Sequence, residues 1–312
     1  MRKLISLSIA LAAGCGAGAF KDQARDALPD SGGVQMKTPS SGASGSQLHS
    51  SIDPAQQALA TASDWYKVTV AYAASVNLGT AWTLGVVEAV TGTEPTSCTA
   101  DSCTWGPGSN ALDPLSYKLV VTKNGDTFDW ELDAQPKSPA GSPFAKIIHG
   151  NAVPSGIRHR GSGTFTIDLD AAATLPNHST DQGKIRIRYS NVGPASVEAH
   201  FDGVKDSNPN HTGQIGNAYY NYQQDASGGG DLEIAWHNLT SDERADIHSR
   251  WKVDGSGRSD VMLVPTNGSP PFSECWDTAV NGFVTTFNAS IGTESACSIQ
   301  GQVFGSHIND AP

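Results

Sequence analysis

The sequence predicts a mainly β protein, in which a broad antiparallel meander forms a curled sheet or partly open barrel around a buried N-terminal helix. Two observations support this fold class. Apolar and polar residues alternate in repeated short runs between about residues 115 and 304. Residues 53–92 hold few charges and repeat their apolar side chains at helical spacing. A helix that is apolar on most sides needs a surrounding surface, which a curling sheet provides.

The first 14 residues have the pattern of a signal peptide. A basic start precedes a short apolar run, too short for a permanent membrane span, and the run ends in Leu-Ala-Ala-Gly before Cys15. This ending resembles a bacterial lipobox, with Ala12 where Leu is commonest. The resemblance implies that Cys15 is acylated and becomes the mature N-terminus. The alternative is an ordinary secretory signal that is cut at a small residue, with Cys15 incidental.

Both interpretations export the chain. Gly16 follows Cys15, where Asp would favour retention in the inner membrane of well-studied bacteria, so the outer membrane is the expected location. The formal net charge is -11, which argues against nucleic acid as a partner because nucleic-acid binding rewards clustered Lys and Arg. With no basic patch, membrane affinity would come from the acyl chains on the N-terminus.

Residues 15–51 are rich in Ser and Gly, which predicts a flexible tether. Order is expected from residue 52, because Asp53 as N-cap, Pro54 and Gln56 form a helix-start signature. Two other interpretations of the apolar stretch stay open. Tyr66 to Tyr72 also alternates like a strand, and residues 68–87 are long enough to span a membrane. A buried helix is favoured over both.

Period-two runs then follow one another to residue 304, separated by Gly, Asn and Pro turns, and residues 305–312 read as a tail. One hairpin can be specified by residue. If Ser190 faces Ser196, Arg188 lies opposite Glu198 on the water side and Tyr189 meets Val197 in the core. The clearest alternating runs are 128–132, 165–169, 185–189, 197–201 and 232–236.

Four cysteines besides Cys15 indicate two disulfides in an exported chain. Three pairings are open, and we favour the two local ones, Cys98–Cys103 and Cys275–Cys297. A zinc site is disfavoured because no His lies at ligand spacing.

We find no established catalytic motif, so no catalytic residue, metal or cofactor is assigned. Asp129, Glu131 and Asp133 alternate on one strand, which is typical of a solvated face but leaves a carboxylate-dependent hydrolase as an alternative. The acidic Gly loops 202–210 and 225–231 could bind calcium, although turn chemistry explains them equally well.

Several short motifs resemble a group of uncharacterised bacterial predicted lipoproteins over roughly residues 53–297, and this group carries no known function. The motifs are Ser249–Trp251, Gly255–Asp260, Ser273–Asp277, Trp105–Pro107 and Leu112–Pro114. Within them, Arg258 and Asp260 are expected to form a side-chain pair that fixes a turn.

The sequence thus favours a lipid-anchored, non-enzymatic envelope protein that binds a lipid-like small molecule or another envelope protein. The predicted architecture is similar to that of the lipoprotein carriers of the bacterial envelope. Aromatic residues expected to face such a ligand are Tyr66, Trp130, Trp236 and Trp251. The alternative is a structural or surface-interaction lipoprotein with a filled core. A continuous apolar cavity would distinguish the two.

Overall fold

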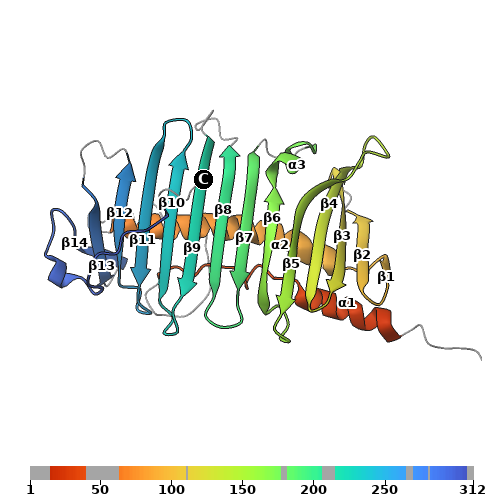
Figure 1. Cartoon of the computed structure of the whole chain (residues 1–312), viewed down its shortest axis with the longest axis horizontal. Coiled ribbons are helices and arrows are strands. Elements are labelled where there is room, and N and C mark those ends of the chain that lie inside the picture. Colours follow the sequence, from red (N-terminus) through yellow and green to blue (C-terminus); the bar gives the residue numbers. More distant parts are fainter. Residues whose placement is uncertain are drawn as a thin grey trace, which may run out of the picture.

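A computed structural model describes residues 15–39, 63–109, 112–176, 181–205, 215–264, 270–279 and 282–307. Within these ranges the chain forms one antiparallel sheet of fourteen strands (Figure 1). Each strand pairs with its neighbours in sequence, from β1 at one edge to β14 at the other, and these two edges do not pair with each other. The predicted broad antiparallel meander is confirmed, and it is an open sheet.

The strands are mostly eight to ten residues long. Their bounds are β1 Ser97–Cys98, β2 Ser102–Gly108, β3 Leu115–Asn124, β4 Thr127–Pro136, β5 Ala145–Pro154, β6 Gly161–Asp168, β7 Gln182–Ser190, β8 Ser196–Lys205, β9 Ile215–Gln224, β10 Gly230–Asn238, β11 Glu243–Trp251, β12 Gly257–Val264, β13 Phe272–Ala279 and β14 Gly282–Phe287.

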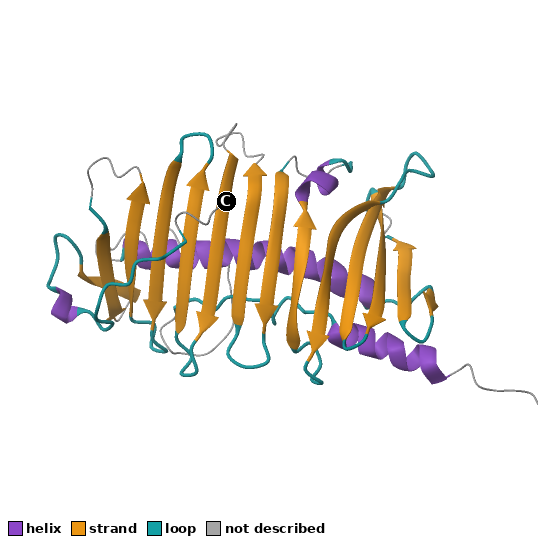
Figure 2. Cartoon of the chain, in the orientation of Figure 1, coloured by secondary structure: helices purple, strands orange, loops and turns teal. Residues whose placement is uncertain are grey.

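The long helix α2, Asp64–Thr91, crosses the strands along the length of the sheet (Figure 2). We call the face that it covers the inner face. Ser63 caps the helix, since its Oγ accepts a hydrogen bond from the Tyr66 amide at 3.1 Å. The predicted start at Asp53 lies outside the described residues. By length and composition α2 could cross a membrane, and here it packs on the sheet.

One expectation about α2 is wrong, because the helix is buried along one side and not all round. Val76, Leu84 and Val87 are buried against the sheet, while Leu78 on the opposite side is 69% exposed. Three buried threonines of the helix, Thr69, Thr80 and Thr91, donate hydrogen bonds to carbonyl oxygens of the helix itself. Thr80 Oγ1, for example, donates to the Val76 carbonyl oxygen one turn earlier at 3.0 Å.

The prediction that residues 15–51 form a flexible tether also needs correction for residues 15–39, which have a defined structure. Cys15–Ala27 form helix α1, whose side chains Phe20 and Ala24 are buried at the β1–β5 end of the sheet. Residues 28–39 then run beside α2, where the Asn77 amide exchanges two hydrogen bonds with the Met36 backbone, at 2.7 and 2.8 Å. Apolar residues at helical spacing in α1 outweigh the Gly- and Ser-rich composition that suggested disorder.

The β7–β8 hairpin confirms the predicted register. Ser190 pairs with Ser196, and Tyr189 with Val197. On the water side Arg188 Nη1 lies 3.6 Å from Glu198 Oε2. The alternation and the charges together therefore specified this hairpin correctly.

Three boundaries differ from the expected ones. The strands were expected to begin near residue 115, but the hairpin of β1 and β2 precedes it. The alternation of β2 is interrupted, because its register with β3 shifts between Trp105 and Gly108. The run expected through residue 169 stops at Asp168, whose side chain caps helix α3, Leu169–Ala173. After β14, residues 288–304 hold a single 3-10 turn, η3, Glu294–Ala296, and no strand within the described range.

The end of the described chain, residues 297–307, which we call the C-terminal segment, crosses the outer face of β13 to β9 (Figure 1). It begins at the Cys275–Cys297 disulfide. The other disulfide, Cys98–Cys103, joins β1 to β2, so both predicted pairings are confirmed.

The predicted Arg258–Asp260 pair is present on this outer face, with Arg258 Nε 2.7 Å from Asp260 Oδ1, and both side chains are fully buried. Residues 305–312 were expected to form a tail, but His307 is held on the sheet, with its Nδ1 2.6 Å from Glu233 Oε1.

Candidate functional site

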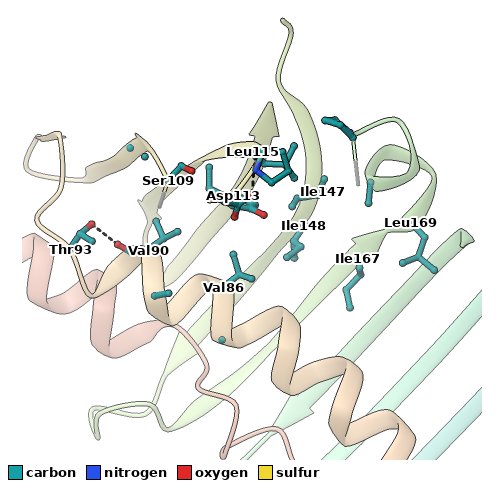
Figure 3. A pocket seen from close by; sticks show the side chains of 18 of the residues that line it. Val86, Val90, Thr93, Ser109, Asp113, Leu115, Ile147, Ile148, Ile167 and Leu169 are labelled. Atoms are coloured by element: carbon teal, nitrogen blue, oxygen red, sulfur yellow. Dashed lines mark hydrogen bonds between the residues drawn. The ribbon is translucent and has the colours of Figure 1, made fainter. Parts of the chain in front are cut away.

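A cavity of about 1220 Å³, partly open to solvent, lies between α2 and one end of the sheet (Figure 3). The second half of α2 forms one wall. Strands β2, β3, β5 and β6 and the short helix α3 form the others. The cavity lies on the inner face, in the half of the molecule where α1 also packs.

Small residues of α2 leave this space empty. Ala81, Gly85 and Ala89 recur every four residues, so they lie on one side of the helix and line the cavity. A Cβ placed on Gly85 would meet no heavy atom within 4 Å. The helix therefore stays at a distance from the strands that its own side chains do not fill.

The opposite wall is aliphatic. Ile147 and Ile148 are adjacent in sequence and both are buried and line the cavity. This arrangement departs from strand alternation because the β4–β5 register shifts between Leu132 and Asp133, which leaves Ile147 as an extra residue. Ile167 of β6 and Leu169 of α3 extend the same surface (Figure 3).

The rim at β2 depends on a glycine. Gly106 has φ +84°, and a Cβ there would lie 2.3 Å from the Tyr117 carbonyl oxygen. Only glycine fits this conformation and this close approach without strain. The Trp105–Pro107 motif noted in the sequence thus shapes the edge of the cavity, where the β2–β3 register shifts.

Polar residues line the cavity in more than one place. Ser109 and Asp113 lie apart from Ile167 and Leu169 (Figure 3), and Asp181 directly precedes β7, which contacts α3. Asp113 Oδ1 accepts a hydrogen bond from the Leu115 amide at 2.9 Å. Burial, and secondly the Asp113 carboxylate, raise the pKa of the Tyr117 phenol to about 12, so the phenol stays protonated at neutral pH.

A second, shallower hollow of about 560 Å³ lies on the outer face over β3 to β6. Two of the three carboxylates that line it are ion-paired, with Lys118 Nζ 2.8 Å from Asp133 and Lys146 Nζ 2.5 Å from Glu131. Burial raises the pKa of Asp133. Burial is also the largest single influence on Glu131, but the hydrogen bonds from Lys146 and Asp133 and the charges of the two lysines together outweigh it and lower that pKa. Asp129 and Glu131 thus lie on the charged, solvated face that the sequence favoured, whereas Asp133 is buried.

The four aromatic residues expected to face a ligand do not line the inner cavity. Tyr66 packs against Phe283 at the other end of α2, with ring centroids 4.3 Å apart. Trp130 borders the outer hollow, but its side chain is buried, and Trp251 stacks on Tyr222. Trp236 packs against the core. These large rings pack in the interior, whereas the cavity is left by small residues.

The acidic Gly loops show turn chemistry where they are described. Asp225 Oδ1 accepts hydrogen bonds from the Ser227 amide at 2.7 Å and the Gly229 amide at 2.9 Å. Most of the loop 202–210 lies outside the described residues. In the part of the chain that the structure covers, no group of three or more His, Cys, Asp and Glu side chains is placed to hold a metal ion.

Sequence reasoning missed the residues that make the cavity. The Ala81-Gly85-Ala89 spacing was visible as a signal, since small residues four apart on an apolar helix mark a side with room next to it. The extra residue Ile147 had no such signal, because a bulge depends on the partner strand. Comparison with known proteins adds no assignment: no family model matches the chain, and no curated protein or solved structure is significantly similar to it.

Proposed function

We propose that this protein is a lipid-anchored envelope protein that binds a lipid-like small molecule in the cavity beside α2. The observation that carries the proposal is the cavity itself, whose volume of about 1220 Å³ exceeds the few hundred Å³ expected of a ligand site. Its walls are mainly aliphatic. A protein with a filled core would pack α2 directly on the strands, so the cavity favours binding over the structural alternative.

The chemistry of the walls supports an apolar ligand. Ile147, Ile148, Ile167 and Leu169 present branched aliphatic surface from three neighbouring elements. Burying an apolar chain against such a surface stabilises the complex by roughly 25 cal/mol for each Å² removed from water. Pockets that are largely apolar and carry a few polar groups are the usual form of small-molecule sites.

The anchor is proposed at Cys15, the first residue of α1. Phe20, buried in the core, follows five residues later, which is roughly 8 Å along a helix. Acyl chains on Cys15 would therefore hold the β1–β5 end of the fold, and with it the cavity, close to the membrane. Export and the outer membrane remain part of this proposal on the grounds of the leader and Gly16.

Two glycines of α2 provide a matched test of the cavity. Gly85 lines it, whereas Gly79 lies six residues away on the exposed side, and a Cβ at either position meets nothing within 4 Å. Gly85→Trp should fill the space without a clash at Cβ. Gly79→Trp makes the same chemical change in the same helix and should leave the cavity open.

Binding would be measured with a neutral, environment-sensitive naphthylamine dye, and by native mass spectrometry for co-purified lipid. We expect the wild-type protein and Gly79→Trp to bind the dye, and Gly85→Trp to bind at least about tenfold more weakly. Both variants should keep the far-UV circular dichroism of the wild type. A wild-type protein that binds neither dye nor lipid, or a Gly85→Trp variant that binds as well as wild type, would refute the proposal.

A further inference from the structure

Polar contacts hold the C-terminal segment on the outer face of the sheet. The Val303 amide donates a hydrogen bond to Asp260 Oδ2 at 2.9 Å, and the Val303 carbonyl oxygen lies 2.9 Å from His248 Nδ1. The His307 amide donates to Glu233 Oε1 at 3.0 Å, and His307 Nδ1 lies 2.6 Å from the same oxygen. Beyond its disulfide, every described residue of the segment is at least partly exposed, so little apolar burial adds to these bonds.

His248 makes both of its contacts only when it is protonated. Its Nδ1 faces the Val303 carbonyl oxygen, and its Nε2 lies 2.8 Å from the Asp231 carboxylate. Both partners are acceptors, so each ring nitrogen has to donate, and a histidine with two N–H groups is the charged form. Burial lowers the pKa of His248, but the hydrogen bond and the charge of Asp231 outweigh it and raise this pKa.

Asp246 of β11 also favours its protonated form beneath the segment. It points to the outer face, because its neighbour Ile247 packs in the core on the inner face. Its side chain is fully buried, and neither carboxylate oxygen has a hydrogen-bond partner in the described structure. Gly305 of the segment lies directly on it, since a Cβ at this glycine would overlap the carboxylate. Movement of the segment would therefore return the carboxylate to water.

The ionisable groups around Asp246 act on it with both signs. Burial is the largest influence, the Glu233 carboxylate is the second, and together they raise the pKa of Asp246 to about 6 against the His307 amide and the charges of the two histidines. Other ionisable side chains on this face are Tyr219, whose ring stacks on His307, and the pairs Asp231–His248, His237–Asp242, Arg244–Asp242, Arg250–Asp260 and Arg258–Asp260.

We propose that the C-terminal segment is a pH-sensitive strap, which lies on the sheet in acid and opens more readily as the pH rises to neutral, with Asp246 and His248 as the groups that respond. The closed state holds a proton on both residues, and the open state, in which water reaches them, binds fewer protons. Opening is therefore favoured as the pH rises from 3.8, the ordinary value for Asp, through about 6, and loss of the His248 proton acts in the same direction. The segment and the cavity lie on opposite faces, so this response requires no ligand in the cavity.

Hydrogen exchange at the Val303 and His307 amides of the whole protein would measure the opening. Protection is taken relative to the intrinsic exchange rate at each pH, and we expect it to fall at least about tenfold between pH 4.5 and pH 7.5. At both pH values these amides should exchange at least about tenfold faster than those of β11, because the segment opens while the sheet stays folded.

Variants assign the response to the two residues. Asp246→Asn cannot ionise, so protection of the segment at pH 7.5 should rise at least about tenfold, with a smaller gain at pH 4.5. Adding His248→Gln should bring protection at the two pH values to within about threefold of each other. The matched control is Asp129→Asn, which changes an exposed carboxylate of β4 on the same face and should keep the wild-type response.

Protection that does not change with pH in the wild type, or a change that persists in the double variant, would overturn the proposal. Exchange of the segment at the same rate as β11 would also overturn it, because the segment would then open only when the sheet unfolds. Loss of the response in Asp129→Asn would overturn the assignment to Asp246 and His248, because it would trace the response to the net charge of the face.

Discussion

Asp246 of β11 should destabilise the fold at neutral pH, so that Asp246→Asn is stabilising. Its side chain is fully buried beneath the C-terminal segment, at Gly305. Neither carboxylate oxygen has a hydrogen-bond partner within the described structure, although the nearby His307 amide favours the charged form. Burial, and secondly the Glu233 carboxylate, raise the pKa of Asp246 to about 6.

The magnitude and the sign follow from linkage. The folded state holds the proton of Asp246 up to about pH 6, whereas an unperturbed Asp loses it near 3.8. The folded state therefore binds more protons between these values, and stability falls as pH rises through that window. The full penalty above it is about 3 kcal/mol, at 1.36 kcal/mol for each pKa unit, and about 1 kcal/mol is already present at pH 4.5.

Urea unfolding at pH 8 and pH 4.5 would measure the effect. We expect Asp246→Asn to raise the free energy of unfolding by about 2–3 kcal/mol at pH 8 and by about 1 kcal/mol at pH 4.5, with the slope against urea unchanged. An amide of the same shape cannot ionise, so it removes the cost of a buried, unpaired charge. A variant that is less stable than wild type at pH 8, or a gain that does not change with pH, would refute this reasoning.

Asp260 on the neighbouring strand is the matched control. It is also fully buried, but it is paired, with Arg258 Nε 2.7 Å from Oδ1 and Arg250 Nη2 2.9 Å from Oδ2. Asp260→Asn should therefore destabilise the protein by about 3–5 kcal/mol, because it leaves the buried Arg258 without its main charge partner. The same substitution at two buried acids on one face is thus expected to act in opposite directions.

Three further predictions concern other parts of the chain. Cys15→Ser should release the protein from the membrane fraction and abolish an acylated N-terminal peptide in mass analysis; retention of that peptide mass or of membrane association would contradict the anchor. Replacing Cys275 and Cys297 by Ala should cost about 3 kcal/mol in thermal or urea unfolding, as expected for a loop of 22 residues, and no loss would show that this loop is already constrained. Val76→Asp places a charge against the apolar sheet and should cost several kcal/mol, whereas Ser75→Asp on the exposed side should stay within about 0.5 kcal/mol; equal melting temperatures would mean that α2 is not packed there.

The sequence predicted those features that depend on local pattern. Alternation with complementary charges specified the β7–β8 register, down to Arg188 opposite Glu198. Cysteine spacing in an exported chain led to both disulfides. The apolar period correctly indicated a helix over residues that also alternate between Tyr66 and Tyr72. In each case the deciding interaction is made by residues close in sequence or by a single strand partner.

Features that depend on distant packing could not be predicted in the same way. The apolar stripe that holds Val76, Leu84 and Val87 marks the buried side of α2, but the exposure of Leu78 could not be predicted, because Leu78 is as apolar as Leu84. The cavity depends on the distance between α2 and a bulge at Ile147, which no local pattern contains. Residues 28–39 dock through the buried side chains of Leu28, Val34 and Met36 and through the Asn77 amide, which bonds a backbone 41 residues away.

The sequential strand order has a consequence for how this fold can change length. Each hairpin extends the sheet by two strands, roughly 9.6 Å across the strands, and disturbs the pairing of its two neighbours only. The helix that crosses them would have to change with it. Between Tyr66, which contacts β13 and β14, and Val90, which lies beside β2 and β3, α2 advances 24 residues past eleven strand spacings, so each hairpin corresponds to about four helix residues. Four residues are close to one turn and return to nearly the same side of the helix. Deleting β7 and β8 together with four residues of α2 should give a shorter protein of the same fold, whereas deleting the hairpin alone should leave the buried side of α2 out of step with the sheet.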